Sequence, residues 1–137
     1  MGRNPEAIER YIAGVSGIEC TGAVDDAIAQ LAAAKVAVVP VLSGSGTRLK
    51  IIEAWAAGTP VVSTTLGAEG LPARHGDNIL LADDAPSFTA AISHLLDSAA
   101  DRERIGNRGR EQYERELTWN EAWKALDREL EPLVTPR

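Results

Sequence analysis

Apolar positions along the chain fall into continuous runs and helical spacings, and the two patterns alternate. Residues 36–41 and 60–64 are short apolar runs, the pattern of strands buried on both faces of a parallel sheet. Residues 78–82 predict another short strand, and residues 17–22, a short segment between two glycines, predict one more. The chain is therefore expected to contain several short strands.

Between and after these runs, apolar residues recur three or four positions apart, as they do in amphipathic helices. Helices are predicted at residues 5–13, 25–34, 47–57, 86–96, 101–116 and 118–130. Gly58 is a natural stop for the third, and Thr118 with Glu121 forms a capping box for the last. Gly106 and Gly109 weaken the prediction for the fifth, because glycine is unfavourable inside a helix.

Alternating strands and helices followed by helices alone predict an α/β domain with a parallel sheet flanked by helices and a helical C-terminus. The 137 residues are one domain's worth. Aromatic residues make up only 4%, and alanine supplies much of the apolar content, so close helix–sheet packing is expected.

A formal net charge of −6 argues against a nucleic-acid partner, since phosphate polymers need basic patches. Cys20 is the single cysteine, which suits a reducing compartment. No apolar run approaches a membrane span or a leader segment, so a soluble cytoplasmic domain is expected. His75 and His94 lack metal-ligand spacing, and no metal is expected.

The most informative stretch is residues 36–57, which predicts a buried strand, a glycine turn and a helix. Such a turn brings backbone N–H groups and a helix N-terminus to one place, which suits an anion such as a diphosphate. The loop is neither a Walker A motif nor G-x-G-x-x-G, since Leu49 stands where the third glycine belongs. Arg48 and Lys50 add positive charge there, although for either residue alone a solvated helix surface is the better interpretation.

Glu53 is a carboxylate on the predicted apolar side of this helix. A rotation of about 100° per residue groups it with Leu49, Ile52 and Ala56. One interpretation is a structural ion pair with Lys50 or another cation. The other is a carboxylate lining a cleft at the carboxyl edge of the sheet, where it accepts hydrogen bonds from ligand hydroxyls such as those of ribose.

The stretch GSGTRLKIIEAWAAGTPVVSTTLGAEGL resembles the nucleotide-sugar-binding half of the retaining family-four glycosyltransferases, which have the GT-B fold. The family's elements are a strand ending in proline, a glycine turn, a helix with E-A-M-A-x-G and then P-V-V. Here they stand at Pro40, residues 44–46, residues 53–58 and residues 60–62. The resemblance continues through residues 67–70, 78–83 and 117–119, so it covers nearly the whole chain and implies a Rossmann-like sheet, half of a GT-B fold.

The resemblance implies roles for individual residues. Glu53 matches the second glutamate of the family's E-x7-E motif, which binds the ribose of the donor, and residues 22–24 would lie near its base. The implied nucleotide-sugar-binding residues are Gly44, Ser45, Gly46, Thr47, Arg48, Leu49, Lys50 and Glu53.

Two positions depart from the family pattern. Ser45 occupies the position of the first motif glutamate, which touches the donor sugar; a serine can hydrogen-bond a hydroxyl but supplies no charge, and no catalytic residue is assigned. Trp55 replaces the usual methionine and is interpreted as core packing.

The implied activity is transfer of a sugar, with retention, from a UDP-, GDP- or similar nucleotide-diphosphate sugar to an acceptor glycan or lipid-linked glycan. No cofactor or metal is implied, and a full-length protein could associate with a membrane. On this interpretation residues 1–137 are a partial domain, because the acceptor domain, the first strands and the main phosphate-binding Arg and Lys are missing. The chain alone is expected to be inactive, with a free sheet edge near residues 18–21 able to pair two copies.

Two alternatives remain. A non-catalytic nucleotide-binding or interaction module of the same fold is supported by Ser45. A flavodoxin-like regulatory domain would need an acidic cluster with a phosphorylatable Asp at a strand end, and residues 40–43 contain none.

Overall fold

The computed structural model describes residues 6–44 and 46–134. Its centre is a three-stranded parallel sheet with the order β1-β2-β3, formed by β1 (Ala37–Val39), β2 (Val61–Ser63) and β3 (Leu80–Leu81). Val38 lies opposite Val62 in the register of the first pair. The predicted parallel α/β arrangement is confirmed.

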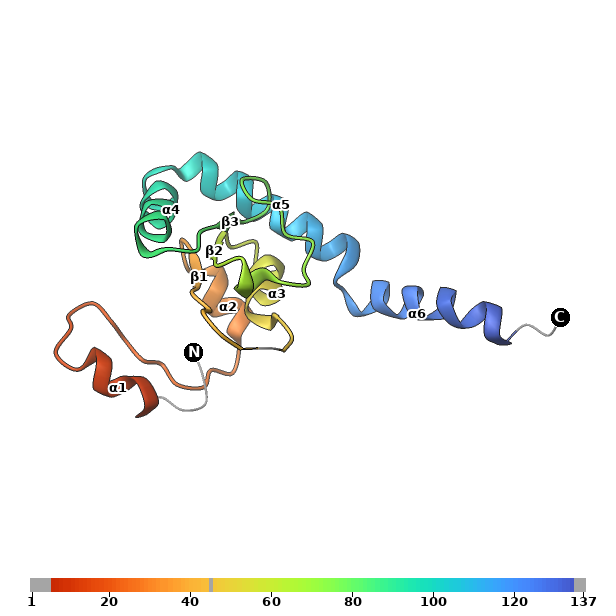
Figure 1. Ribbon diagram of the computed structural model, residues 1–137, viewed down its shortest axis with the longest axis horizontal. Helices are drawn as coiled ribbons and strands as arrows, with labels where there is room; N and C mark the ends of the chain where they lie inside the picture. Colours follow the sequence, from red (N-terminus) through yellow and green to blue (C-terminus); the bar gives the residue numbers. More distant parts are fainter. Residues whose placement is uncertain (1–5, 45, 135–137) are drawn as a thin grey trace.

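Helices flank the sheet and extend beyond it (Figure 1). In chain order they are α1 (Glu6–Ile12), α2 (Ala27–Ala32), α3 (Leu49–Ala56), the 3-10 helix η1 (Leu66–Ala68), α4 (Ala85–Asp97), α5 (Ala99–Glu116) and α6 (Trp119–Val134). In Figure 1, α1 lies apart from the sheet and α6 projects away from it. All of the predicted helices are present, and the expected helical C-terminus is confirmed.

Side-chain caps explain where several helices begin. Asp26, Asp84 and Ser98 each accept a hydrogen bond from the backbone N–H three residues later, at 2.8, 2.8 and 3.2 Å. Thr118 accepts one from the N–H of Glu121 at 3.3 Å, which is one half of the predicted capping box. Local polar residues therefore position α2, α4, α5 and α6.

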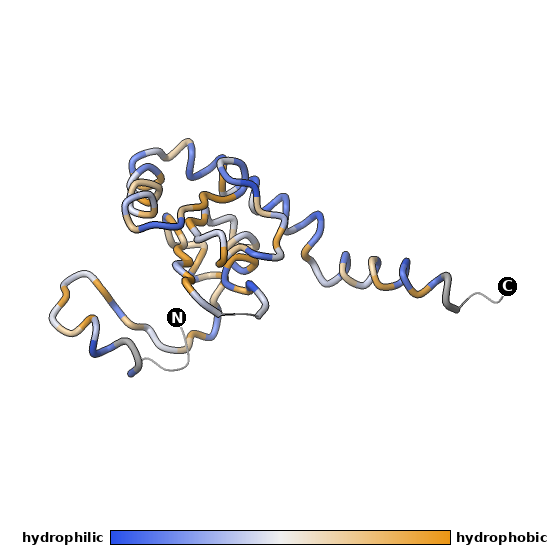
Figure 2. Tube along the Cα trace, viewed as in Figure 1, coloured by the Kyte–Doolittle hydropathy of each residue, from blue (hydrophilic) through white to orange (hydrophobic). Residues whose placement is uncertain are grey.

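Apolar side chains cover both faces of the sheet, and Figure 2 shows the sheet and much of α3 as hydrophobic. On one face, α3 contributes Ile51, Ala54 and Trp55 to a buried cluster with side chains of β1 and β2. On the other face, Val62 packs with Leu95 of α4 and Ile105 of α5. The sheet thus lies between α3 on one face and α4 on the other, and α5 contacts both of these helices.

The expectation that residues 36–41 form a strand buried on both faces is wrong for Val38 and Pro40, which are exposed, and the strand itself covers Ala37–Val39. Val38 is 49% exposed, whereas its neighbour Val62 in β2 is fully buried. The difference arises because α4 packs more extensively against β2 than against β1. The same residue type is therefore buried or exposed according to which strand a helix covers.

The strand predicted at residues 17–22 is also wrong. Gly17 and Gly22 have φ of 82° and 65°, left-handed values that interrupt extended backbone. A strand needs a neighbour to pair with, and these residues pair with no strand in the described part of the chain. The edge strands of the described sheet are instead β1 and β3.

Helix α5 crosses α3 at two glycines that no other residue could replace without displacement. A Cβ at Gly106 would lie 2.3 Å from the carbonyl oxygen of Gly58, and one at Gly109 would lie 2.4 Å from Cδ1 of Trp55. Trp55 is fully buried there, and its indole N–H donates to the carbonyl of Asn78 at 3.0 Å. Its predicted role in core packing is confirmed, and the glycines serve close approach rather than weakening the helix.

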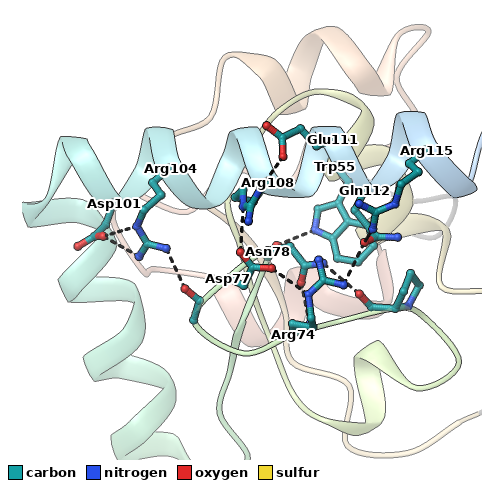
Figure 3. A network of polar contacts seen from close by, with 12 residues as sticks. Trp55, Arg74, Asp77, Asn78, Asp101, Arg104, Arg108, Glu111, Gln112 and Arg115 are labelled. Atoms are coloured by element: carbon teal, nitrogen blue, oxygen red, sulfur yellow. Dashed lines mark hydrogen bonds and ion pairs between the residues drawn. The ribbon is translucent and has the colours of Figure 1, made fainter.

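A polar network ties α5 to the loop before β3 (Figure 3). Asp77 accepts from Nε of Arg74 at 2.9 Å and from Nε of Arg108 at 3.0 Å, and Arg104 donates to the carbonyl of Gly76 at 2.9 Å. The hydrogen bond from Arg74, followed by that from Arg108, holds the pKa of Asp77 below its ordinary value. The carboxylate is therefore favoured in its charged form in the folded chain.

We predict that Gly106→Ala destabilises the protein. Alanine is favoured over glycine inside a helix by roughly 1 kcal/mol. Backbone lies 2.3 Å from the new methyl group and cannot rotate away, and overpacking typically costs about 1–3 kcal/mol. The free energy of unfolding in urea should fall by about 1 kcal/mol or more, whereas the exposed neighbour control Asn107→Ala should stay within about 0.5 kcal/mol of wild type. Equal stability of Gly106→Ala and wild type would contradict the close contact.

We also predict a loss of stability in acid that depends on Asp77. A lowered pKa in the folded chain means that the charged form contributes stability above the ordinary value of 3.8, and that this stability is lost as the pH falls through the lower, folded pKa. Urea unfolding of wild type and Asp77→Asn between pH 7 and pH 2 should show a smaller pH dependence in the variant. Parallel curves would mean that the network does not stabilise the fold.

Candidate functional site

A pocket of about 410 Å³ lies where the carboxyl end of β1 meets the glycine loop and the start of α3. Its described lining residues are Val39, Val41, Ser43, Gly44, Thr47, Arg48, Leu49, Lys50, Ile51 and Gly67. In open parallel sheets, ligands bind outside the carboxyl ends of the strands. The pocket therefore occupies the place where this fold class binds its ligands.

Gly67, which follows β2 in the helix η1, lines the pocket opposite the start of α3. Its N–H donates to the hydroxyl of Thr64 at 2.9 Å, and this hydroxyl donates to the carbonyl of Val41, another lining residue, at 2.6 Å. A Cβ at Gly67 would lie 2.5 Å from Oγ of Ser63, so a larger residue would displace this part of the lining. Thr64, which the sequence did not single out, therefore connects two lining residues without lining the pocket itself.

The loop that enters α3 leaves the first turn of the helix open. Gly44 and Gly46 have φ of 121° and 117°, a backbone region that favours glycine. The helix begins at Leu49 rather than at the predicted residue 47, and its N-cap, Arg48, makes no side-chain cap. The N–H of Ile51 donates to the carbonyl of Arg48 at 3.0 Å, so the N–H groups of Leu49 and Lys50 are the ones without a capping side chain, a condition that suits an anion.

Arg48 is not the solvated surface residue that its position alone would also allow. Its side chain is only 12% exposed and pairs with Glu69 at 3.4 Å. Its Nε is buried and has no hydrogen-bond partner among the described residues. A buried donor without an acceptor costs about 1–3 kcal/mol, so the unpaired Nε of Arg48 is an unfavourable feature of the fold. Lys50, by contrast, is an exposed residue at the pocket wall.

The side of α3 that was predicted to be buried is not the side that the structure buries. The residues buried are Ile51, Ala54 and Trp55, whereas the expected apolar face is partly exposed, with Leu49 55% exposed. Apolar residues stand on both sides of this short helix, and burial of the large Trp55 against α5 decides which side turns inward.

Glu53 is consequently half-buried on the outer face of α3. Within residues 6–44 and 46–134 its carboxylate has no hydrogen bond or ion pair, so the predicted pair with Lys50 does not form there. It does not line the pocket, but it lies one helical turn beyond Leu49, which does.

The structure thus brings together most, not all, of the predicted site residues. Gly44, Thr47, Arg48, Leu49 and Lys50 line the pocket, whereas Gly46, Glu53 and residues 22–24 are not part of its lining. Ser45 lies outside the described residues. Glu69, which the sequence did not single out, belongs to the site through its ion pair with Arg48.

Groups of three or more His, Cys, Asp or Glu side chains that could hold a metal ion are absent from the part of the chain that the structure describes. Of the described helices, none combines the length and the apolar character needed to cross a membrane.

The fold and the pocket define a parallel α/β domain with an anion-suited site at the carboxyl ends of its strands. The family model for glycosyl transferases group 1 matches residues 1–98, and the chain belongs to this family. The family resemblance found in the sequence is confirmed, and the parallel sheet with flanking helices is consistent with half of a GT-B fold.

Similar proteins carry names from this class. The chain is 36% identical over 121 residues to an MMP alpha-(1->4)-mannosyltransferase of Mycolicibacterium hassiacum, covering 81% of the chain. It is 40% identical over 103 residues, 72% of the chain, to the lipopolysaccharide core biosynthesis glycosyltransferase LpsE of Rhizobium meliloti. It is 33% identical over 141 aligned residues, 98% of the chain, to a phosphatidyl-myo-inositol mannosyltransferase of Mycobacterium leprae. The chain spans only 29%, 29% and 37% of the lengths of these relatives.

Proposed function

We propose that this chain is the donor-binding domain of a retaining glycosyltransferase that transfers a hexose from a nucleotide-diphosphate sugar to an acceptor glycan or lipid-linked glycan. The observation that carries the proposal is the half-buried, unpartnered Glu53 carboxylate one helical turn from the glycine-loop pocket in the described chain. Membership of the group 1 family supports sugar transfer, and two relatives named as mannosyltransferases support a hexose.

In this proposal the ligand lies along the start of α3. The diphosphate occupies the pocket beside the uncapped N–H groups of the first helical turn, and Glu53 accepts hydrogen bonds from the ribose hydroxyls. Glu53 is four positions after Leu49, which corresponds to about 6 Å along a helix at 1.5 Å per residue. The protein would favour front-face displacement by positioning the sugar and stabilising charge on the departing diphosphate.

Sugar transfer also requires parts of the protein outside this chain. Since the chain spans about a third of its relatives, we propose that it is a partial domain that binds the donor but transfers no sugar alone. The acceptor would be held by the missing domain. No metal, cofactor or nucleic acid takes part, and the cytoplasm is the proposed compartment, on the net charge of −6 and the single cysteine.

The alternative is a non-catalytic nucleotide-binding module of the same fold, favoured by Ser45 at the position of the family's first motif glutamate. A serine can hydrogen-bond a sugar hydroxyl but brings no charge to the transition state. Sugar transfer by the full-length protein, compared between wild type, Ser45→Ala and Glu53→Gln, separates the two functions. Turnover that falls in both variants supports the enzyme, and no turnover in wild type supports the module.

We predict that Glu53→Gln weakens binding of UDP or GDP to this chain. A hydrogen bond to a charged acceptor contributes roughly 1.5–3 kcal/mol, so the affinity should fall about tenfold or more. Isothermal titration calorimetry measures the change, with inorganic pyrophosphate as a ligand that has no ribose and should bind both proteins equally.

The matched control is Glu103→Gln, which removes the same charge from an exposed position on α5. It should leave the affinity for UDP and GDP unchanged. Equal nucleotide affinity of Glu53→Gln and wild type would overturn the ribose assignment.

We propose in addition that two copies of the chain pair along β1. Within the described sheet, β1 has β2 as its one neighbour, so its other edge presents unpaired N–H and C=O groups. Sedimentation velocity should show an average mass that rises towards a dimer with protein concentration. A monomer at every concentration would contradict pairing.

A further inference from the structure

Arg48 and Glu69 form an unequal ion pair at the pocket. The side chain of Arg48 is 12% exposed, whereas that of Glu69 is 71% exposed. The shortest contact, from an Nη of Arg48 to a carboxylate oxygen of Glu69, is 3.4 Å, longer than the usual charge-assisted hydrogen bond. The guanidinium is therefore held in the protein by packing more than by its partner.

Most of the donor capacity of Arg48 is unused. A guanidinium has five N–H donors, and among the described residues the hydrogen-bond partner of Arg48 is Glu69. The buried Nε has no partner there. Since Arg48 lines the pocket, an oxyanion bound in it could accept hydrogen bonds from the Nη groups, in the paired contact that guanidinium favours.

We propose that Arg48 binds an oxyanion of the ligand and that Glu69 is its exchangeable partner, displaced when the oxyanion binds. The inference rests on the proposed function in taking the ligand to be a nucleotide-diphosphate sugar. The oxyanion is either the diphosphate or a carboxylate on the sugar, since both match the planar guanidinium. Glu69 returns to water on displacement, where its exposed side chain is readily solvated.

The arrangement distinguishes Arg48 from Lys50. Both line the pocket, but Lys50 is exposed, and an exposed ammonium is screened by water and salt. Arg48 is enclosed, so its attraction to a bound anion is screened less. Glu69 supplies a countercharge when the pocket is empty, and it competes with the ligand for the same guanidinium.

The direct test is the side-chain Nε–Hε NMR resonance of Arg48, identified by its loss in Arg48→Lys. Titration with inorganic pyrophosphate should move this resonance if the diphosphate is the oxyanion. Titration with glucuronate should move the same resonance if the oxyanion is a sugar carboxylate. Movement with either anion supports the proposal, and no movement with both overturns it.

The second test measures pyrophosphate affinity in variants. Arg48→Gln should weaken binding about tenfold, and Glu69→Gln should tighten it about threefold because the competing carboxylate is gone. In the Arg48→Gln background, Glu69→Gln should have no further effect, since it acts through Arg48. Should Arg48→Gln not fold, the exposed Glu69→Gln still decides the question.

Glu103→Gln is again the charge-matched control and should leave pyrophosphate affinity unchanged. Affinity in Glu69→Gln no higher than in this control would overturn the exchange. If Glu53→Gln weakens UDP binding but the Arg48 resonance does not move, the donor site is supported and the role of Arg48 is contradicted. If pyrophosphate moves the Arg48 resonance but UDP and GDP binding does not depend on Glu53, an anion site is supported and the proposed function is contradicted.

Discussion

The contact between Trp55 and α5 is the interaction on which the rest of this structure depends. The indole lies against Gly109 so closely that a Cβ there would be 2.4 Å from its Cδ1, and its N–H donates to the carbonyl of Asn78. This one side chain therefore joins α3, α5 and the segment before β3. Since α5 carries few apolar residues, the large buried ring and the glycines that admit it supply much of what holds the helix to the sheet.

The same contact orients the site. With Trp55 turned towards α5, the opposite face of α3 must face outward, which leaves Glu53 half-buried and without a partner in the described chain. The start of α3 is then directed at the pocket after β1, where Arg48 is enclosed. A core interaction thus determines which polar groups reach the ligand, although the tryptophan itself lies outside the pocket lining.

Charge around this core is arranged in two different ways. Between α5 and the loop before β3, the carboxylate of Asp77 accepts hydrogen bonds from two arginines, so its charge is well paired (Figure 3). At the pocket, Arg48 has one long contact and a buried donor with no partner among the described residues. Paired charges stabilise the packing of helices, whereas the incompletely paired cation identifies the surface that a ligand completes.

Local signals in the sequence determined most of the helices and strands and the family to which the chain belongs. Continuous apolar runs, the caps at Asp84 and Thr118, and the motif around Glu53 act within a few residues, so they can be recognised without the fold. Tertiary structure decided the rest: the inward face of α3, the exposure of Val38, the absence of a strand at residues 17–22 and the pairing of Arg48 with Glu69. Each of these features depends on contacts between residues that are distant in the chain. Apolar residues stand on both faces of α3, so the sequence alone does not determine its orientation, and the packing of Trp55 against α5 does.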